Sequence, residues 1–118
     1  MTNQTLIEKI KSAPDTITFN EVIDFINNTY HYTPAQFHNG HSDDMVTNDA
    51  GTNEGSCKIF AFAQLAGLAE TETLNCFGDY YRIDVLQHPD NTDHANIRTF
   101  IRHGWNGIKF QSPALVAK

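Results

Sequence analysis

Positive charge is scarce in this sequence. Of its 118 residues eight are Lys or Arg, against fourteen Asp or Glu, and the formal net charge is −6. Proteins that bind nucleic acid neutralise phosphates with clustered Lys and Arg, and anionic membrane surfaces attract polybasic segments. Here the basic residues are spread along the chain. The sequence therefore predicts no nucleic-acid partner and no electrostatic attachment to a membrane.

Cysteines and long apolar runs are also few. Cys57 and Cys76 are the two cysteines, which is too few for a disulfide framework or a zinc ribbon. The longest apolar stretch, residues 59–69, is shorter than the roughly 20 residues that cross a bilayer. The N-terminus lacks the apolar core of a signal peptide. We expect a cytoplasmic protein with reduced thiols and without a membrane span.

Motifs that hold cofactors or metals are missing as well. The glycine spacing matches neither the Walker loop nor the dinucleotide fingerprint, so no cofactor is predicted. His38 and His41, together with Asp43 and Asp44, have side chains that suit zinc or iron. These four residues lie in a predicted loop, where the backbone does not enforce a ligand geometry. We interpret them as solvated turn residues and predict no metal site.

The chain is rich in phenylalanine, and most of it shows helical periodicity. Eight phenylalanines supply large apolar areas for a small core. A length of 118 residues fits one domain, residues 1–118. The periodicity predicts an α+β fold, mainly α. It should have four or five helices around a central apolar helix over 57–66, and at most a small two- or three-stranded sheet.

Several helix boundaries can be read directly. Thr18 and Glu21 have capping-box spacing, which predicts a helix that begins there and ends near residues 28–30. Residues 57–66 are apolar on nearly all sides and are followed by Gly67, a C-terminal capping residue. A further short helix should begin at residue 71 or 73. A last helix should end at Gly104, capped at its start by Asp90, Thr92 or Asp93.

Residues 31–55 have a different character. They contain repeated Asn-Gly and Asp-rich turn signals, and they predict a long loop with a short strand or hairpin at most. Long loops on a helical scaffold commonly carry binding residues. Residues 107–110 form another extended signal. The tail beyond Ser112 shows no pattern, and we expect it to fray.

Four segments in this order resemble the HopJ family of type III effectors. They are residues 51–63 (GTNEGSCKIFAFA), 76–82 (CFGDYYR), 92–98 (TDHANIR) and 104–110 (GWNGIKF). The resemblance covers roughly residues 37–110. It implies a bacterial protein and, as an alternative to a cytoplasmic location, export through a type III system, with which the polar N-terminus is compatible. It implies no particular activity.

Gly55-Ser56-Cys57 is the sharpest chemical signal. A thiol in the first turn of a helix is close to the positive end of the helix dipole, which lowers its pKa and favours the nucleophilic thiolate. His94 or His103 would be the base. This arrangement defines one hypothesis, a thiol-dependent hydrolase or acyl-transferase. A buried, structural Cys57 is the alternative interpretation, and the sequence leaves open whether the protein is an enzyme.

The other hypothesis, which we favour, is a binding or interaction protein. It rests on the long loop and on the lack of a complete catalytic set. Its partner would be a protein or a small molecule that is not yet identified. The predicted ligand-binding residues are polar or aromatic side chains and one glycine near the loop and the helix ends: Asn39, Asn53, Gly55, Ser56, Tyr81, Arg82 and Trp105. We also expect the start of the Cys57 helix and the segment 94–105 to converge on one surface concavity.

Overall fold

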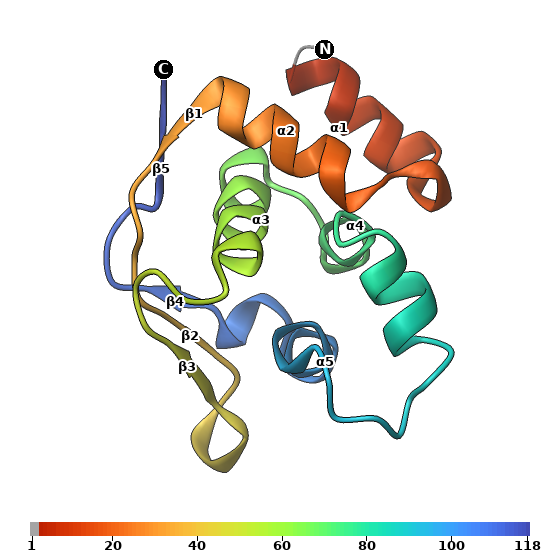
Figure 1. Cartoon of the computed structure of the whole chain (residues 1–118), viewed down its shortest axis with the longest axis vertical. Helices are drawn as coiled ribbons and strands as arrows, with labels where there is room; N and C mark the ends of the chain where they lie inside the picture. The colour runs from red at the N-terminus through yellow and green to blue at the C-terminus, as the bar shows by residue number, and fades with distance from the viewer. Residues whose placement is uncertain (1–2) are drawn as a thin grey trace.

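Helix α3 lies at the centre of the computed structural model, which describes residues 3–118 (Figure 1). Its side chains from Cys57 to Ala63 are buried except for that of Lys58. The α+β, mainly α fold is confirmed, with five α-helices and two small antiparallel sheets among the described residues. The helices are α1 (Asn3–Ser12), α2 (Phe19–Thr29), α3 (Glu54–Ala66), α4 (Glu70–Asn75) and α5 (Ala95–His103). The strands are β1 (Tyr30–Tyr32), β2 (Phe37–Asn39), β3 (Val46–Asn48), β4 (Lys109–Phe110) and β5 (Leu115–Ala117).

Aromatic rings hold the core around α3. The buried ring of Phe60 contacts the rings of Phe37, Phe77, Phe100 and Trp105, with centroid distances between 5.0 and 6.3 Å. These four rings come from β2, the turn after α4, α5 and the turn after α5. One phenylalanine thus ties the helical part of the fold to the sheet, as the abundance of phenylalanine suggested.

The ends of the first two helices follow the local sequence. α1 ends at Ser12, just before Pro14, and Thr18 caps α2 with a capping box. The Glu21 backbone N–H donates to Thr18 Oγ1 at 3.2 Å, and the Thr18 backbone N–H donates to Glu21 Oε2 at 2.9 Å. The predicted cap at Gly67 is also present, in the left-handed region at φ 69°.

The strands form two separate sheets. One has the order β3-β2-β4, and the other pairs β1 with β5. In the second, Tyr30 lies opposite Ala117 and Tyr32 opposite Leu115. The prediction that the tail beyond Ser112 frays is therefore wrong. Leu115 is buried, and the Lys118 backbone N–H donates to the Thr29 carbonyl at 3.1 Å. This pairing joins residues more than 80 positions apart, and local sequence carries no signal for it.

The segment between α4 and α5 departs most from expectation. α4 ends at Asn75, and after a turn a π-helical segment, Tyr80–Val85, takes the place of a continued α-helix. The cap of α5 is His94, at φ 52°, and not one of the three residues predicted from side-chain chemistry. No described helix is both long enough and apolar enough to span a bilayer.

Replacing Thr18 by Ala should lower the free energy of unfolding by about 1 kcal/mol, because it removes the acceptor in the capping box. Urea unfolding monitored by circular dichroism measures the change. Thr71→Ala, at an exposed position in the first turn of α4, is the matched control and should leave the midpoint nearly unchanged. Equal midpoints for both variants would contradict this role of Thr18.

Candidate functional site

A cavity of about 470 Å³ lies where the N-terminal ends of α3 and α5 meet. Its polar wall comes from the residues that begin the two helices, and its apolar wall from α2, β3 and the turn after α4. The lining residues are Phe19, Val46, Asn53, Gly55, Ser56, Phe77, Tyr80, His94, Ala95, Asn96 and Ile97. We call this the α3–α5 cavity.

The two residues that cap these helices have unusual backbone conformations. Asn53 precedes α3 at φ 49° and His94 precedes α5 at φ 52°, both left-handed. Ser42 is the one other non-glycine residue with positive φ among residues 3–118. Neither cap makes a side-chain hydrogen bond to its helix. Because first-turn N–H groups have no acceptor within their own helix, both helices begin beside the cavity with uncapped donors.

His94 is oriented by an acidic partner. Its Nε2 lies 3.0 Å from Asp84 Oδ2 and 3.8 Å from Asp93 Oδ2. The ring also lies against that of Tyr80, with centroids 5.2 Å apart. The Asp84 contact fixes the direction of the ring and leaves Nδ1 as the nitrogen without a carboxylate partner. His94 therefore presents one hydrogen-bonding nitrogen on a fixed ring.

A network of amide side chains, of which those of Asn39, Asn48 and Asn96 are buried, borders the cavity. Asn96 Nδ2 donates to Asn48 Oδ1 at 2.8 Å, and Asn48 Nδ2 donates to Asn96 Oδ1 at 3.0 Å. Asn39 Nδ2 donates to the Asn96 backbone carbonyl at 2.8 Å, and Asn53 Nδ2 donates to Asn48 Oδ1 at 2.7 Å. The network thus joins β2, β3, the cap of α3 and the first turn of α5. It holds the two walls of the cavity at a fixed separation.

The structure brings together part of the predicted site. Asn53, Gly55, Ser56 and His94 all line the α3–α5 cavity. Asn39 lies in the amide network and does not reach the wall. The expected convergence of the start of α3 with the 94–105 segment thus holds at His94 and does not extend to Trp105.

Cys57 lies outside the cavity. Its side chain is 1% exposed, and Sγ donates to the Ala35 carbonyl at 3.8 Å, on the side of α3 that faces Tyr32. Burial raises the pKa of the Cys57 thiol, the opposite of what its place in the first turn predicts. Burial, with the nearby thiol and carboxylate of Cys57 and Glu54, also raises the pKa of Tyr32. These features are those of a structural cysteine.

His103 belongs to a different cluster, at the far end of α5. Its Nε2 lies 2.7 Å from Asp44 Oδ2, and its ring packs edge-on against that of His41, with centroids 5.1 Å apart. Arg102 also donates to Asp44, through Nε at 2.7 Å and through Nη2 at 3.0 Å. Through these contacts Asp44 connects the 42–44 turn to α5. His38 points elsewhere, with Nδ1 3.2 Å from Thr47 Oγ1.

The remaining predicted residues are held in structural contacts. Trp105 is half-buried against Phe60, and its indole N–H donates to the Leu68 carbonyl at 3.0 Å. Tyr81 packs against the core. Arg82 donates to three backbone carbonyls, those of Pro14, Ile17 and Asn75, and to the Asn75 side chain. The side-chain donors of Arg82 are therefore taken up by these contacts.

Sequence reasoning missed seven of the eleven wall residues: Phe19, Val46, Phe77, Tyr80, Ala95, Asn96 and Ile97. Five of them lie in the segments 76–82 and 92–98 that resemble the family, whereas Phe19 and Val46 belong to no such segment. The ring centroids of Phe19 and Tyr80 are 5.1 Å apart. Phe19 also packs against Gly55, in the first turn of α3, where a Cβ atom would lie 2.8 Å from Phe19 Cζ. The sequence carries no signal for this long-range contact.

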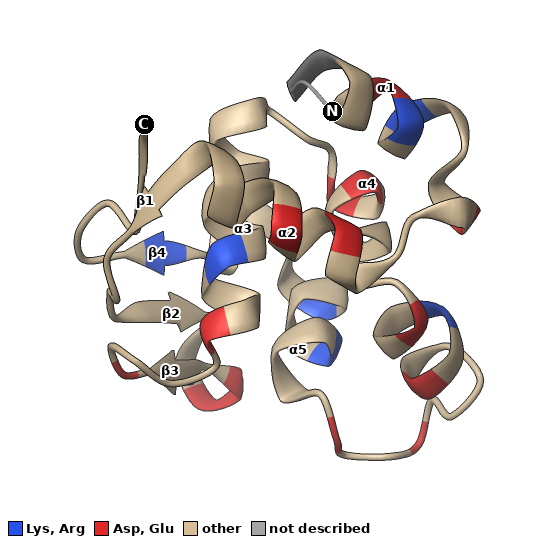
Figure 2. Ribbon diagram, turned by 45° about the horizontal axis from the view of Figure 1, so that its top comes forward, with Lys and Arg blue, Asp and Glu red and all other residues tan. Residues whose placement is uncertain are grey.

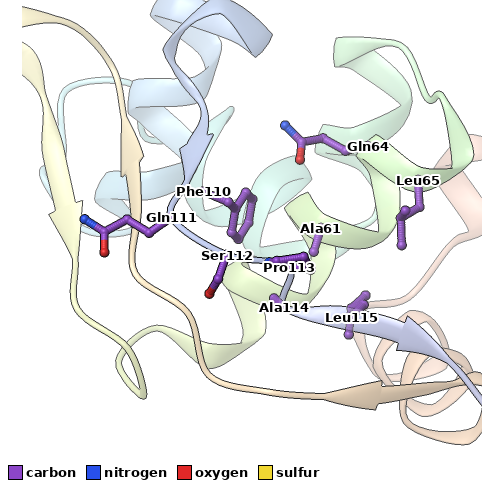
Figure 3. Close-up of a pocket in the computed structure, with 9 residues that line it drawn as sticks. All are labelled: Ala61, Gln64, Leu65, Phe110, Gln111, Ser112, Pro113, Ala114 and Leu115. Carbon is purple, nitrogen blue, oxygen red and sulfur yellow. The ribbon is translucent and has the colours of Figure 1, made fainter.

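A second cavity, of about 420 Å³, lies between α3 and the segment that joins β4 to β5 (Figure 3). Ala61, Gln64 and Leu65 come from α3 and face residues 110–115. Its lining holds no charged or titratable side chain and none of the residues predicted for the site. The α3–α5 cavity, which has a histidine, a hydroxyl group and two helix ends, offers the more specific chemistry.

Comparisons with known proteins agree with this fold. The family model described as HopJ type III effector protein matches residues 3–115. A solved structure, described as the crystal structure of the unknown function protein VPA0580, is 47% identical and superposes with a TM-score of 0.94. The superposition covers 100% of this chain and 95% of the other. Among curated proteins no relative matches.

Cys57 should react slowly with iodoacetamide in the folded protein, because the thiol is buried and its pKa is raised. Mass spectrometry of peptides after timed alkylation separates Cys57 from Cys76, which is also buried and serves as the internal control. Both should become reactive together in urea. Alkylation of Cys57 in the folded protein near pH 7, well ahead of Cys76, would restore the thiol-enzyme hypothesis.

Asp44 should contribute stability that is lost in acid. Its hydrogen bonds from Arg102 and His103 lower its pKa from 3.8 to about 2. A depressed carboxyl pKa stabilises the folded state above the unfolded pKa, so the contribution is present above about pH 4 and disappears as the pH falls through about 2.

Asp44→Asn should therefore lower the urea midpoint at pH 7 and flatten its decline between about pH 4 and 2. Asp43→Asn, in the same exposed turn, is the control and should keep the wild-type pH profile. A wild-type profile for Asp44→Asn would show that the contact of Asp44 with α5 adds no stability.

Proposed function

The chain belongs to the HopJ type III effector protein family, and from this premise we propose that it is a binding protein whose small-molecule ligand lies in the α3–α5 cavity. The family carries no activity by name, and the solved relative is itself described as of unknown function. The proposal therefore rests on the chemistry of the cavity. Export through a type III system, and a cytoplasmic location as its alternative, stay predictions.

The left-handed conformations of Asn53 and His94 are the observation that carries the proposal. Such conformations cost energy in residues other than glycine and gather at functional sites, where surrounding contacts maintain them. Here two of the three such residues line one cavity and begin the two helices that form its polar wall. Packing of the core alone does not require this coincidence, because a glycine or a side-chain cap would begin either helix at lower cost.

The lining suits a ligand with an apolar body and hydrogen-bonding groups at one end. Phe77 and Ile97 are buried and form the apolar floor. Asn53, Ser56 and His94 supply polar groups. A volume of about 470 Å³ lies within the range of roughly 300–1,000 Å³ typical of small-molecule sites. Five of the eleven lining residues carry polar side chains, so the cavity offers several hydrogen-bonding groups beside its apolar surface.

The thiol-dependent hydrolase or acyl-transferase stays a prediction with less support. It requires Cys57 to meet a base, and Cys57 contacts the Ala35 carbonyl while His94 contacts Asp84 and His103 contacts Asp44. The uncapped N–H groups of α3 face the cavity, and the thiol does not line it. A binding role uses the groups that line the cavity and needs no rearrangement of α3.

Filling the cavity should abolish ligand binding. Ala95 is exposed on the cavity wall, so Ala95→Trp places an indole in the cavity without burying it in the core. A fragment library of small apolar molecules with one polar group, screened by ¹H–¹⁵N NMR, should give fragments that shift the amide signals of Gly55, Ser56 and Asn96. These fragments should weaken at least about tenfold in Ala95→Trp.

The matched control is Ala50→Trp, at an exposed alanine in the loop before α3 and outside the cavity lining. It should bind the same fragments as the wild type does. Fragments that cluster instead in the cavity between α3 and residues 110–115, or that bind Ala95→Trp unchanged, would refute the proposal.

A further inference from the structure

A separate hollow lies on the other side of the Phe19–Tyr80 ring pair. It measures about 390 Å³ and is lined by Thr18, Phe19, Asn20, Asp79 and Tyr80. None of these residues is among the ligand-binding or catalytic residues predicted from the sequence. Thr18 and Asn20 flank Phe19 at the start of α2, and Asp79 precedes the π-helical segment. The two cavities share the two rings and no other lining residue.

The two rings stand nearly at right angles. Their planes meet at 79°, with centroids 5.1 Å apart. Tyr80 is 44% exposed, and Phe19 is half-buried. The face of an aromatic ring carries partial negative charge and attracts cations within about 6 Å of its centroid. The rings touch edge to face, so the negative potential available to the hollow comes from the ring faces that this contact leaves uncovered.

The one charged side chain that lines the hollow is also negative. Asp79 is the one ionisable carboxylate in the lining, it is exposed, and its side chain caps no helix. No Lys or Arg lines the hollow. Helix α2, which begins at its edge, carries acidic but no basic residues (Figure 2).

Lys9 and Arg82, on elements that neighbour the hollow, are engaged elsewhere. Lys9 lies 2.7 Å from Glu21, and Arg82 donates to the carbonyls of Pro14, Ile17 and Asn75. No side chain of the described chain therefore neutralises the hollow from within. Aromatic faces beside an unpaired carboxylate form the environment that proteins use to hold ammonium groups.

We propose that this hollow binds an organic cation, with an ammonium group held against an uncovered ring face of the Phe19–Tyr80 pair and beside the Asp79 carboxylate. Thr18 and Asn20 border it with polar groups. The cation is either a small molecule with a quaternary ammonium group or the lysine side chain of a peptide. This site lies in a different hollow from the α3–α5 cavity. A failure to bind a cation here would leave the ligand proposed for that cavity untouched, and the reverse also holds.

The test compares a cation with a neutral molecule of the same shape. Choline chloride and 3,3-dimethylbutan-1-ol, which replaces the nitrogen by carbon, are titrated separately into the ¹⁵N-labelled full chain. Choline should bind saturably, with a dissociation constant on the order of millimolar, and should shift the amides of residues 18–20, 79 and 80. The neutral alcohol should bind about tenfold more weakly, because it lacks both the cation–π and the charge contribution.

Variants separate the two contributions. Asp79→Asn keeps the shape and removes the charge, and it should weaken choline binding about threefold to fivefold. Tyr80→Leu should weaken it by a similar factor, whereas Tyr80→Phe keeps the ring and should retain binding. Asp90→Asn, at an exposed carboxylate away from the hollow, is the control for lost charge and should bind like the wild type. Unfolding midpoints confirm that each variant is folded.

Nα-acetyl-lysine methylamide, titrated in parallel, separates the two sources. Tighter binding of the lysine derivative assigns the site to a peptide side chain, and tighter binding of choline assigns it to a small quaternary amine. Either result supports a cation site. Equal binding of choline and the neutral alcohol, shifts confined to other residues, or an unchanged affinity in Asp79→Asn and Tyr80→Leu would overturn the proposal.

Discussion

The pairing of the Asn48 and Asn96 side chains is the interaction on which the arrangement of the site depends. Each amide donates to the other, at 3.0 and 2.8 Å, in a buried environment between β3 and the first turn of α5. A buried amide left without a partner costs about 1–3 kcal/mol, so each residue requires the other in place. Asn39 and Asn53 add their donors to the same pair. Apolar side chains could pack here in several arrangements of β3 against α5. The amide donors, in contrast, all find acceptors in only one arrangement of these elements.

The network explains why two helices begin so close together. Helix starts carry partial positive charge, and two of them side by side repel unless something holds them. Asn53 is both the cap of α3 and a donor to Asn48, and Asn96 lies in the first turn of α5. Their side chains are therefore directed into the network, and neither caps its own helix. The uncapped first-turn N–H groups of α3 follow from the use of Asn53 in the network, and the cavity lies beside them.

Local chemistry predicts the parts of the fold that depend on neighbours in sequence. The Thr18–Glu21 capping box, the end of α3 at Gly67 and the apolar face of α3 are all interactions within a few residues, and the sequence indicates each of them. Long-range pairings have no such signal. Asn39-Gly40 and Asn106-Gly107 look like two independent turns, yet the Gly40 backbone N–H donates to the Gly107 carbonyl at 3.1 Å. For Cys57 the sequence placed the thiol correctly at the start of α3 and could not tell which face of the helix it occupies.

The two rings of the wall that the hollows share are packed differently. Phe19 lies against two glycines, because a Cβ atom on Gly78 would lie 2.7 Å from its backbone nitrogen and one on Gly55 would lie 2.8 Å from the tip of its ring. A larger residue at either glycine would therefore displace Phe19 or be displaced itself. Tyr80 is 44% exposed and is in contact with the rings of Phe19 and His94 at 5.1 and 5.2 Å. Because exposed side chains change rotamer more readily than enclosed ones, we expect Tyr80, and not Phe19, to adapt to an occupant of either hollow.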